Sequence, residues 1–252
     1  MSVDLVTLPE RLDVPKHFRH RPQWRRAWRA MRALLEDPDH TAHALEVGYA
    51  LDGDDAARGL PRFLAHPEGR RLLFERPCLL DKVGDRDWLA SLPEGSFGRA
   101  YLAHMDRNGF EARSLIALHE SQDPIHGRSA DERWYLERFQ LMHDLWHVLS
   151  GYGADGSGEA ALLPFTLAQR GTRAGALLTL GAALKIYTTL GTPWLAYVWR
   201  AWRRGRRAAP LEVLRYEELL PLPLDEVRRA VRIDAPERAH PGGVVDDSWM
   251  AA

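Results

Sequence analysis

Hydrophobic positions recur at three- and four-residue steps along most of the chain, which is the spacing of amphipathic α-helices. The clearest case is residues 20–36, where arginines separate four apolar positions, namely Trp24, Trp28, Met31 and Leu35. Asp37-Pro38-Asp39 ends this run, and a second helix is expected over about 40–51. Because no alternating strand pattern persists, the chain is predicted to be all-α, a single mostly helical domain over residues 1–252.

Shorter helices and turns are expected on either side of the centre of the chain. Leu60 to Phe74 predicts one short helix, residues 76–99 predict turns because they are rich in proline and glycine, and Arg99 to Gly109 predicts a further helix. The polar residues 114–128 predict a loop, and residues 211–233 predict a helical cap. The first 19 or so residues and those after 234 are expected to be extended or frayed.

The strongest helix signal lies between residues 129 and 151. Ser129 and Glu132 have the spacing of a capping box, which satisfies two backbone amides at a helix start, and Gly151 is a natural end for the helix. Apolar residues lie almost all round this helix, which predicts that it is buried. They are Leu136, Phe139, Leu141, Met142, Leu145, Trp146, Val148 and Leu149. A glycine-rich turn, 151–158, leads into another helix from about residue 158.

Residues 174–199 form an apolar stretch with interruptions. A membrane-spanning helix needs ~20 mostly apolar residues without such breaks. The interruptions are Gly181, Lys185, Gly191 and Pro193. We therefore expect two helices that line an apolar, lipid-accommodating cavity or touch a membrane surface, with insertion as a single span as the alternative.

Composition and charge narrow the choice of partners. Apolar residues make up 45% and charged residues 27% of the chain, as in an ordinary folded protein, and the net charge of −1 gives no global attraction to nucleic acid. The sole cysteine, Cys78, excludes a disulfide framework and is expected to be a small packing residue. No secretory signal opens the chain, and its early acidic residues argue against a transit peptide, so a bacterial cytoplasmic location is expected.

Two runs combine tryptophan with arginine, residues 21–32 and 199–207. Such runs suit a membrane surface that carries anionic lipids, where each basic residue contributes ~1 kcal/mol. The alternative for 21–32 is an arginine face in solvent over tryptophans that belong to the core.

Candidate chemistry gathers on the predicted central helix. His143 and His147 are four residues apart, so both imidazoles emerge from one helix face and can reach one divalent cation. Asp144 lies about 100° round the helix and can ligate directly or orient an imidazole. Burying these groups is costly unless something compensates them. A metal ion compensates all three, and a hydrogen-bonded polar cluster is the alternative.

Glu159 follows the glycine-rich turn, which is short enough to fold the next helix back and bring the carboxylate to the opposite wall of the site. A glutamate in the first turn of a helix is also favoured by the helix dipole alone, so the residues leave both interpretations open. His143 to His147 further resembles the metallopeptidase H-E-x-x-H with aspartate for glutamate, and an adjacent His-Asp pair occurs in His-Asp phosphohydrolases. The remaining ligands of those enzymes cannot be placed in this chain.

The motif H-D-x-x-H followed by eleven residues and a glutamate, His143 to Glu159, resembles the signature of the Coq-four family of ubiquinone biosynthesis proteins. The resemblance covers roughly residues 25–233. It includes residues 92–101 (LPEGSFGRAY), 108–110 (NGF), 147–149, 158–159 and 223–228. There are departures: Leu163, followed by Pro164, stands where many members have lysine, and the turn before the glutamate is richer in glycine.

The resemblance implies an all-helical fold and a divalent metal, zinc first, with iron, manganese or cobalt as the alternatives. It assigns His143, Asp144, His147 and Glu159 as the metal ligands and as the catalytic groups. It also implies peripheral attachment to the bacterial inner membrane, a polyprenylated aromatic quinone precursor as ligand, and other ubiquinone biosynthesis proteins as partners. The sequence leaves assembly as a homodimer open.

Two roles follow from the resemblance. The first is metal-dependent, oxidative decarboxylation of the ring carboxyl of a polyprenyl hydroxybenzoate-type intermediate; because zinc has no redox chemistry, oxidation needs another metal or a second cofactor. The second is a non-catalytic lipid-binding scaffold that organises the ubiquinone biosynthetic complex. A metallopeptidase-like hydrolase is the third hypothesis.

Overall fold

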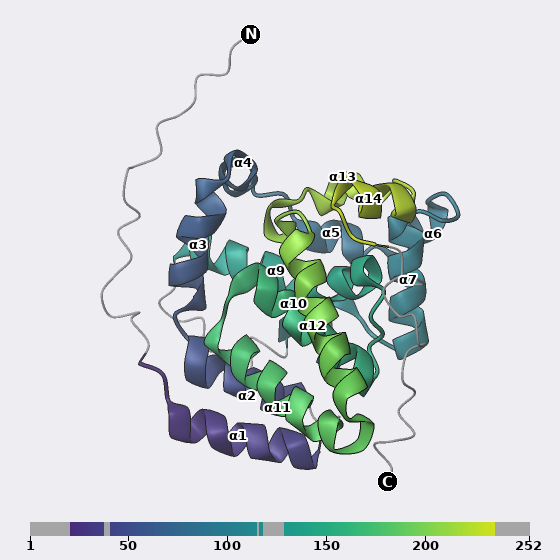
Figure 1. The fold of residues 1–252 in the computed structure, drawn as a ribbon. Helices are drawn as coiled ribbons and strands as arrows, with labels where there is room; N and C mark the ends of the chain where they lie inside the picture. Colours follow the sequence, from purple (N-terminus) through teal and green to yellow (C-terminus); the bar gives the residue numbers. More distant parts are fainter. Residues whose placement is uncertain (1–20, 38–40, 115, 118–128, 235–252) are drawn as a thin grey trace.

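Helices account for nearly all the regular structure in the computed structural model, which describes residues 21–37, 41–114, 116–117 and 129–234 (Figure 1). Within these residues no β-strand occurs, and one isolated antiparallel bridge joins Ser96 to Pro223. The predicted all-α, single-domain fold is confirmed. The predicted extended termini lie outside the described residues.

The helices that the structure describes run from α1 near the N-terminus to α14 near the C-terminus. In chain order they are α1 (Trp24–Glu36), α2 (Thr41–Asp52), α3 (Asp55–Ala65), α4 (Pro67–Glu75), α5 (Leu79–Val83), α6 (Arg86–Ser91), α7 (Phe97–Asn108), α9 (Ala130–Ser150), α10 (Gly156–Arg170), α11 (Arg173–Leu190), α12 (Thr192–Arg207), the 3₁₀ turn η2 (Leu211–Val213), α13 (Tyr216–Leu219) and α14 (Leu224–Ala230).

Helix α9 lies at the centre of the molecule and packs against α3, α4, α5, α7 and α10 (Figure 1). Its predicted start and end are confirmed. The Ser129 hydroxyl accepts from the Glu132 amide at 3.1 Å, the Glu132 carboxylate accepts from the Ser129 amide at 2.8 Å, and Gly151 ends the helix with a φ of 79°. The expected burial is confirmed too, because most residues of α9 beyond Met142 are buried.

Two stretches differ from their predictions. The single helix expected from Leu60 to Phe74 is split into α3 and α4, because Pro67 cannot continue a helix and holds His66 in an extended conformation. The region expected to hold only turns contains α5 and α6. In α6 the carboxylate of Asp85 accepts from the Trp88 amide at 2.9 Å, a cap that stabilises a helix of only six residues. Most of the predicted loop 114–128 lies outside the described residues, but residues 114 and 116–117 are helical, so the loop prediction is wrong for the part that the structure describes.

The apolar stretch 174–199 forms the two expected helices, α11 and α12, which are separated at Gly191, where φ is 65°. None of the helices in the described ranges is long and apolar enough to cross a bilayer. Lys185, which interrupts the stretch, donates a hydrogen bond from its ammonium group to the carbonyl oxygen of Leu35. This contact connects α11 to the end of α1. The predicted apolar cavity beside these helices stays a prediction.

Three side chains for which the sequence allowed or predicted a core position lie at the surface instead. Trp24 and Trp28 are each 58% exposed, whereas α1 buries Ala27, Ala30 and Met31, so the tryptophan-core interpretation of residues 21–32 is wrong. Small residues rather than aromatic rings let α1 approach its neighbours closely. Cys78 is exposed at the start of α5, so its predicted packing role is also wrong.

Candidate metal centre

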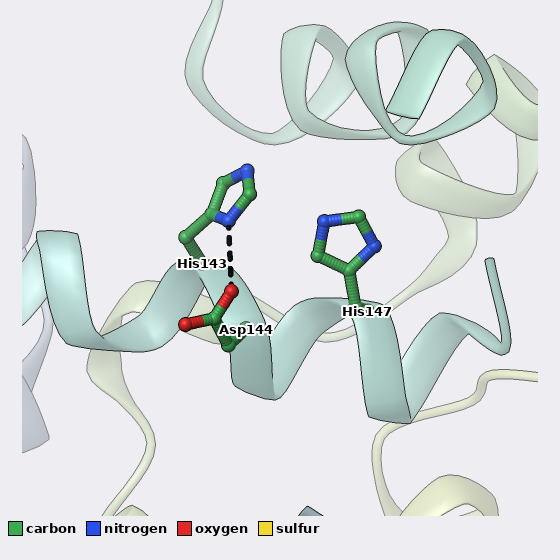
Figure 2. Close-up of side chains that lie close together, drawn as sticks. All are labelled: His143, Asp144 and His147. Carbon is green, nitrogen blue, oxygen red and sulfur yellow. Dashed lines mark hydrogen bonds and ion pairs between the residues drawn. The ribbon is translucent and has the colours of Figure 1, made fainter. Parts of the chain in front are cut away.

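His143 and His147 project from the same side of α9, as their four-residue spacing predicts (Figure 2). Their ring centroids are 4.8 Å apart and the ring planes are nearly perpendicular. The side chain of His147 is completely buried, whereas that of His143 is 41% exposed. The pair therefore runs from the protein interior to the surface.

Asp144 lies beneath the ring of His143 (Figure 2). Its Oδ1 is 3.3 Å from Nδ1 of His143, and the residue is buried. One ligand atom from each of His143, Asp144 and His147 can be chosen so that all lie within 4.8 Å of one another, which is a spacing that could hold a metal ion. The predicted His-Asp-His group is thus present as a cluster in space.

Glu159 reaches this cluster from the first turn of α10. The turn that joins α9 to α10 is tight: the Asp155 carboxylate accepts from the Gly158 amide at 2.7 Å and caps α10. A Cβ at Gly158 would lie 2.1 Å from the carbonyl oxygen of Gly153, so only glycine fits there. The glycine-rich turn noted in the sequence is therefore what allows α10 to fold back over α9.

The carboxylate of Glu159 faces both imidazoles. Its Oε1 is 3.1 Å from Nε2 of His147, and its Oε2 is 3.8 Å from Nε2 of His143. The predicted position of this carboxylate on the opposite wall is confirmed. Glu159 also occupies the first turn of α10, so it has the favourable place near a helix N-terminus that the alternative interpretation invoked.

The hydrogen bonds of the two histidines indicate which nitrogen carries a proton. Nδ1 of His147 is 3.1 Å from the carbonyl oxygen of Tyr152, and a carbonyl can only accept, so Nδ1 donates. The same reasoning assigns the Nδ1 proton of His143, which faces a carboxylate oxygen of Asp144. In the neutral form both rings therefore present a bare Nε2 lone pair toward Glu159.

A lone pair and a carboxylate oxygen repel each other at 3.1 Å unless a positive charge lies between them. A proton on the imidazole or a metal ion supplies that charge. Two bare Nε2 atoms facing a carboxylate, each with Nδ1 bonded to an oxygen, is the arrangement that metal-binding histidines adopt. The side chains present therefore fit a divalent cation.

The pKa shifts of the clustered side chains show that the site favours negatively charged carboxylates together with a positive charge between them. Burial raises the pKa of Glu159, but the charges of His147 and His143 and the contact with His147 outweigh this and lower it to about 2. Burial lowers the pKa of His143, but Asp144 and Glu159 outweigh it and raise the pKa to about 9. For Asp144, the neighbouring imidazoles likewise overcome burial and lower the pKa.

His104, on α7, joins this cluster although the sequence did not single it out. Its ring stacks on that of His147, with centroids 5.5 Å apart and planes 20° apart. The residue is 9% exposed, and its buried Nε2 has no hydrogen-bond partner among the described residues. Burial and the neighbouring His147 lower the pKa of His104 to about 4, which keeps it neutral. Its spacing from the buried Tyr101 and Met105 signals a core-facing position, but not contact with α9.

One side of the cluster is open. The side chains of His143 and Glu159 are 41% and 43% exposed, whereas His147 is sealed. A closed donor set is typical of structural metal sites, and an accessible side is typical of sites that bind an exchangeable ligand. The donor atoms can hold a cation on the buried side of the cluster, and a ligand can reach that cation from the exposed side.

The chain matches a known protein family over most of its length. The family model described as coenzyme Q (ubiquinone) biosynthesis protein Coq4 matches residues 30–237. Similar curated proteins are described as mitochondrial ubiquinone biosynthesis proteins COQ4. The one from Yarrowia lipolytica is 29% identical over 69% of this chain and 65% of its own length. The one from Talaromyces stipitatus is 30% identical over 69% of this chain and 58% of its own. The chain thus spans less than two thirds of these relatives.

A solved structure shares the fold. It is a crystal structure from Nostoc punctiforme of a protein provisionally assigned to ubiquinone biosynthesis, with a TM-score of 0.64 and 21% identity. The match covers 85% of this chain and all of that one.

Proposed function

The chain belongs to the Coq4 family of coenzyme Q (ubiquinone) biosynthesis proteins, and we propose that it uses a divalent metal to remove the ring carboxyl group of a polyprenyl hydroxybenzoate-type intermediate. The observation that carries this proposal is the open side of the cluster, where His143 and Glu159 are half exposed beside the buried His147. A substrate carboxylate can approach the donors from that side. Oxidation with hydroxylation at the same carbon is the fuller form of the proposed reaction.

The donor set comprises four side chains. His143, His147 and Glu159 would hold the cation through the nitrogen and oxygen atoms that face one another, and Asp144 supports it from the Nδ1 side of His143. Two carboxylates in the cluster would repel a carboxylate substrate unless a cation neutralised them. When bound, a divalent metal would supply Lewis-acid stabilisation of the negative charge that the ring gains as its carboxyl group leaves as CO2 and a proton takes its place. Zinc suits the non-oxidative form, and iron, manganese or cobalt suits the oxidative form.

We also place the protein at a membrane surface. Large apolar side chains of the described residues are exposed mainly on three neighbouring helices, α1, α11 and α12. We call this group the apolar surface; it consists of Trp24, Trp28, Leu180, Leu184, Tyr187, Leu195 and Trp199. Exposed apolar residues beside arginines are typical of proteins that lie on a bilayer, where a polyprenyl tail is dissolved.

The alternative is a scaffold in which the metal only holds the fold. With Asp144 as a direct ligand beside His143, His147 and Glu159, the protein would fill the four positions that zinc prefers, and this favours the scaffold. The two roles differ in one measurable way, because a scaffold binds the lipid without changing it.

A turnover experiment separates them. The full chain, purified with its native metal and in parallel loaded with zinc, iron, manganese or cobalt, is given a short-chain prenylated hydroxybenzoate with and without oxygen. An enzyme predicts a decarboxylated ring product that disappears in His147→Ala and persists in His66→Ala, since His66 is exposed between α3 and α4 and does not belong to the cluster. Tight lipid binding with no product for any of these metals would establish the scaffold instead.

A further inference from the structure

A cleft lined by arginines lies near the C-terminal end of α12, and none of the side chains of the metal centre lines it. Its volume is about 460 Å³, and its lining residues are Arg204, Arg206, Arg207, Arg232 and Asp234. Four of the five side chains are cationic and one is anionic, so the cleft is strongly electropositive although the chain as a whole carries a net charge of −1. Such a local concentration of positive charge attracts an anion.

Arg204 distinguishes this cleft from an ordinary basic surface. It is only 8% exposed, and one of its terminal nitrogens, Nη2, donates to the carbonyl oxygens of Ser150 and Asp234 at 2.9 and 3.0 Å. Among the described residues, its Nε and Nη1 are buried without a hydrogen bond of normal geometry, and Tyr152 is the side chain that lies next to the guanidinium group. Buried N–H groups of a charged side chain are rarely left unpaired, because water cannot compensate them there. A guanidinium group with spare donors suits an anionic ligand in the cleft.

We propose that this cleft binds a phosphate group. Guanidinium groups present planar pairs of N–H donors that match the oxygens of a phosphate, and an excess of positive lining charge suits a doubly charged group better than a single carboxylate. The remaining lining arginines, Arg206, Arg207 and Arg232, are exposed at the rim and can adjust around the anion. The lining of the cleft contains none of the side chains of the proposed metal centre.

The surroundings of the cleft suggest two sources for the phosphate. The rings of Trp199 and Trp202 stack 4.9 Å apart on α12, and the guanidinium of Arg206 lies 5.5 Å over the ring of Trp202. The apolar surface thus runs along α12 toward the arginines, which would suit the phosphate of an anionic lipid headgroup. A soluble phosphate or diphosphate compound offers the same chemistry.

Binding measurements on the full, metal-loaded chain test the site. Inorganic phosphate and pyrophosphate are titrated by calorimetry at low and at high salt. We expect saturable pyrophosphate binding that weakens with salt and falls about tenfold or more in each of Arg206→Ala and Arg232→Ala, as loss of a charge-assisted hydrogen bond implies. Arg203→Ala, an exposed arginine on the same helix outside the cleft, is the matched control and should change binding less than twofold.

Vesicles of phosphatidylcholine, with and without phosphatidic acid, identify the source. A lipid source predicts that binding to phosphatidic acid vesicles needs Arg206 and Arg232 and is competed by pyrophosphate. A soluble source predicts that only the phosphate titrations depend on these arginines. Absence of saturable binding to every probe, or equal losses in Arg203→Ala and the cleft variants, would overturn the proposal. Metal content is measured in each variant and should not change, which separates this site from the metal centre.

Discussion

Two oxygen atoms, the carbonyl of Tyr152 and a carboxylate oxygen of Asp144, determine how the imidazoles of the centre present themselves. Each accepts a hydrogen bond from the N–H group of an Nδ1 atom, so each imidazole turns a bare Nε2 toward Glu159. A donor set in which the protons are already placed loses less entropy on binding a cation. The chemistry of the site follows from these contacts as much as from the identity of the ligands.

Replacing either histidine should remove the metal. We expect His143→Ala and His147→Ala each to lower the metal content from about one equivalent per chain to a small fraction, because each loses one of the facing Nε2 donors. Elemental analysis after dialysis measures the content, and His66→Ala is the control. Full retention of metal by both variants would refute the assignment.

Asp144→Asn should weaken metal binding without abolishing it. The amide keeps the shape of the side chain but loses the negative charge that holds His143, and loss of such a supporting carboxylate lowers metal affinity about 10- to 100-fold. Competition with a chelator of known affinity measures the change. An unchanged affinity would show that Asp144 does not support the centre.

The metal-free protein should be most stable at mildly acidic pH. The lowered pKa of Glu159 contributes stability above 4.5 that is lost as the pH falls toward 2. The raised pKa of His143 contributes stability below 6.5 that is lost as the pH rises through about 9. Thermal melts of chelator-treated protein should therefore give the highest Tm between about 4.5 and 6.5. Glu159→Gln should flatten the acid side, and a profile that rises steadily to pH 9 would contradict the expectation.

Among the residues of the candidate site, the sequence predicted those that lie close to one another along the chain. His143, Asp144 and His147 follow from helical spacing, because four residues on a helix are neighbours in space. His104 does not, because it depends on how α7 packs against α9, and spacing within one helix says nothing about the contact between two.

Among the elements, the connection between α9 and α10 has the greatest effect on the centre. Gly158 packs directly on the backbone of Gly153, and this contact sets how closely the first turn of α10 approaches α9. The position of Glu159 therefore depends on a residue that has no side chain.

Gly158→Ala should weaken metal binding and lower stability together. Its Cβ would lie 2.1 Å from the Gly153 carbonyl oxygen, so the turn must open and carry Glu159 away, at a cost of ~1–3 kcal/mol in unfolding free energy. Gly48→Ala is the control, because nothing lies within 4 Å of its Cβ and it should stabilise α2 by ~0.5–1 kcal/mol. Metal titration and denaturant unfolding give both quantities. Wild-type metal affinity in Gly158→Ala would show that the turn is not critical.

The sequence predicted long elements better than short ones. The capping box of α9 and the glycine after it fixed both ends of that helix. By contrast, the break at His66-Pro67 and the short helices α5 and α6 were missed, since helices of five or six residues carry little periodic signal and rely on local caps such as Asp85 and on tertiary packing.

At the scale of the whole molecule, large exposed apolar side chains are unevenly distributed over the surface of the described residues. Most of the large exposed apolar residues of the described chain lie on α1, α11 and α12, on elements that adjoin one another in Figure 1. Apolar periodicity predicted the helices but not their exposed faces, because it cannot tell which side of a helix packs against the protein and which side stays at the surface.

Charge placed on the apolar surface should release the protein from membranes. Trp28→Glu and Leu184→Glu should each lower partitioning to anionic vesicles about fivefold or more, since each loses ~1 kcal/mol or more of apolar burial and adds repulsion from the lipid charge. Phe74→Glu is the matched control, because Phe74 is 75% exposed on α4, outside this surface. Vesicle co-sedimentation measures the change, and equal losses in all three variants would argue against a defined membrane-facing side.

Arg204 has a consequence that reaches across the molecule. Its guanidinium bonds the last residue of α9 and lies 5.0 Å over the ring of Tyr152, the residue whose carbonyl holds His147. An occupant of the arginine cleft and a cation at the histidines therefore share one stretch of backbone. By thermodynamic linkage, the factor by which the anion changes the affinity for the cation equals the factor by which the cation changes the affinity for the anion. Measuring the affinity of each site with the other site empty and filled therefore gives the coupling between them, and the two ratios must be equal.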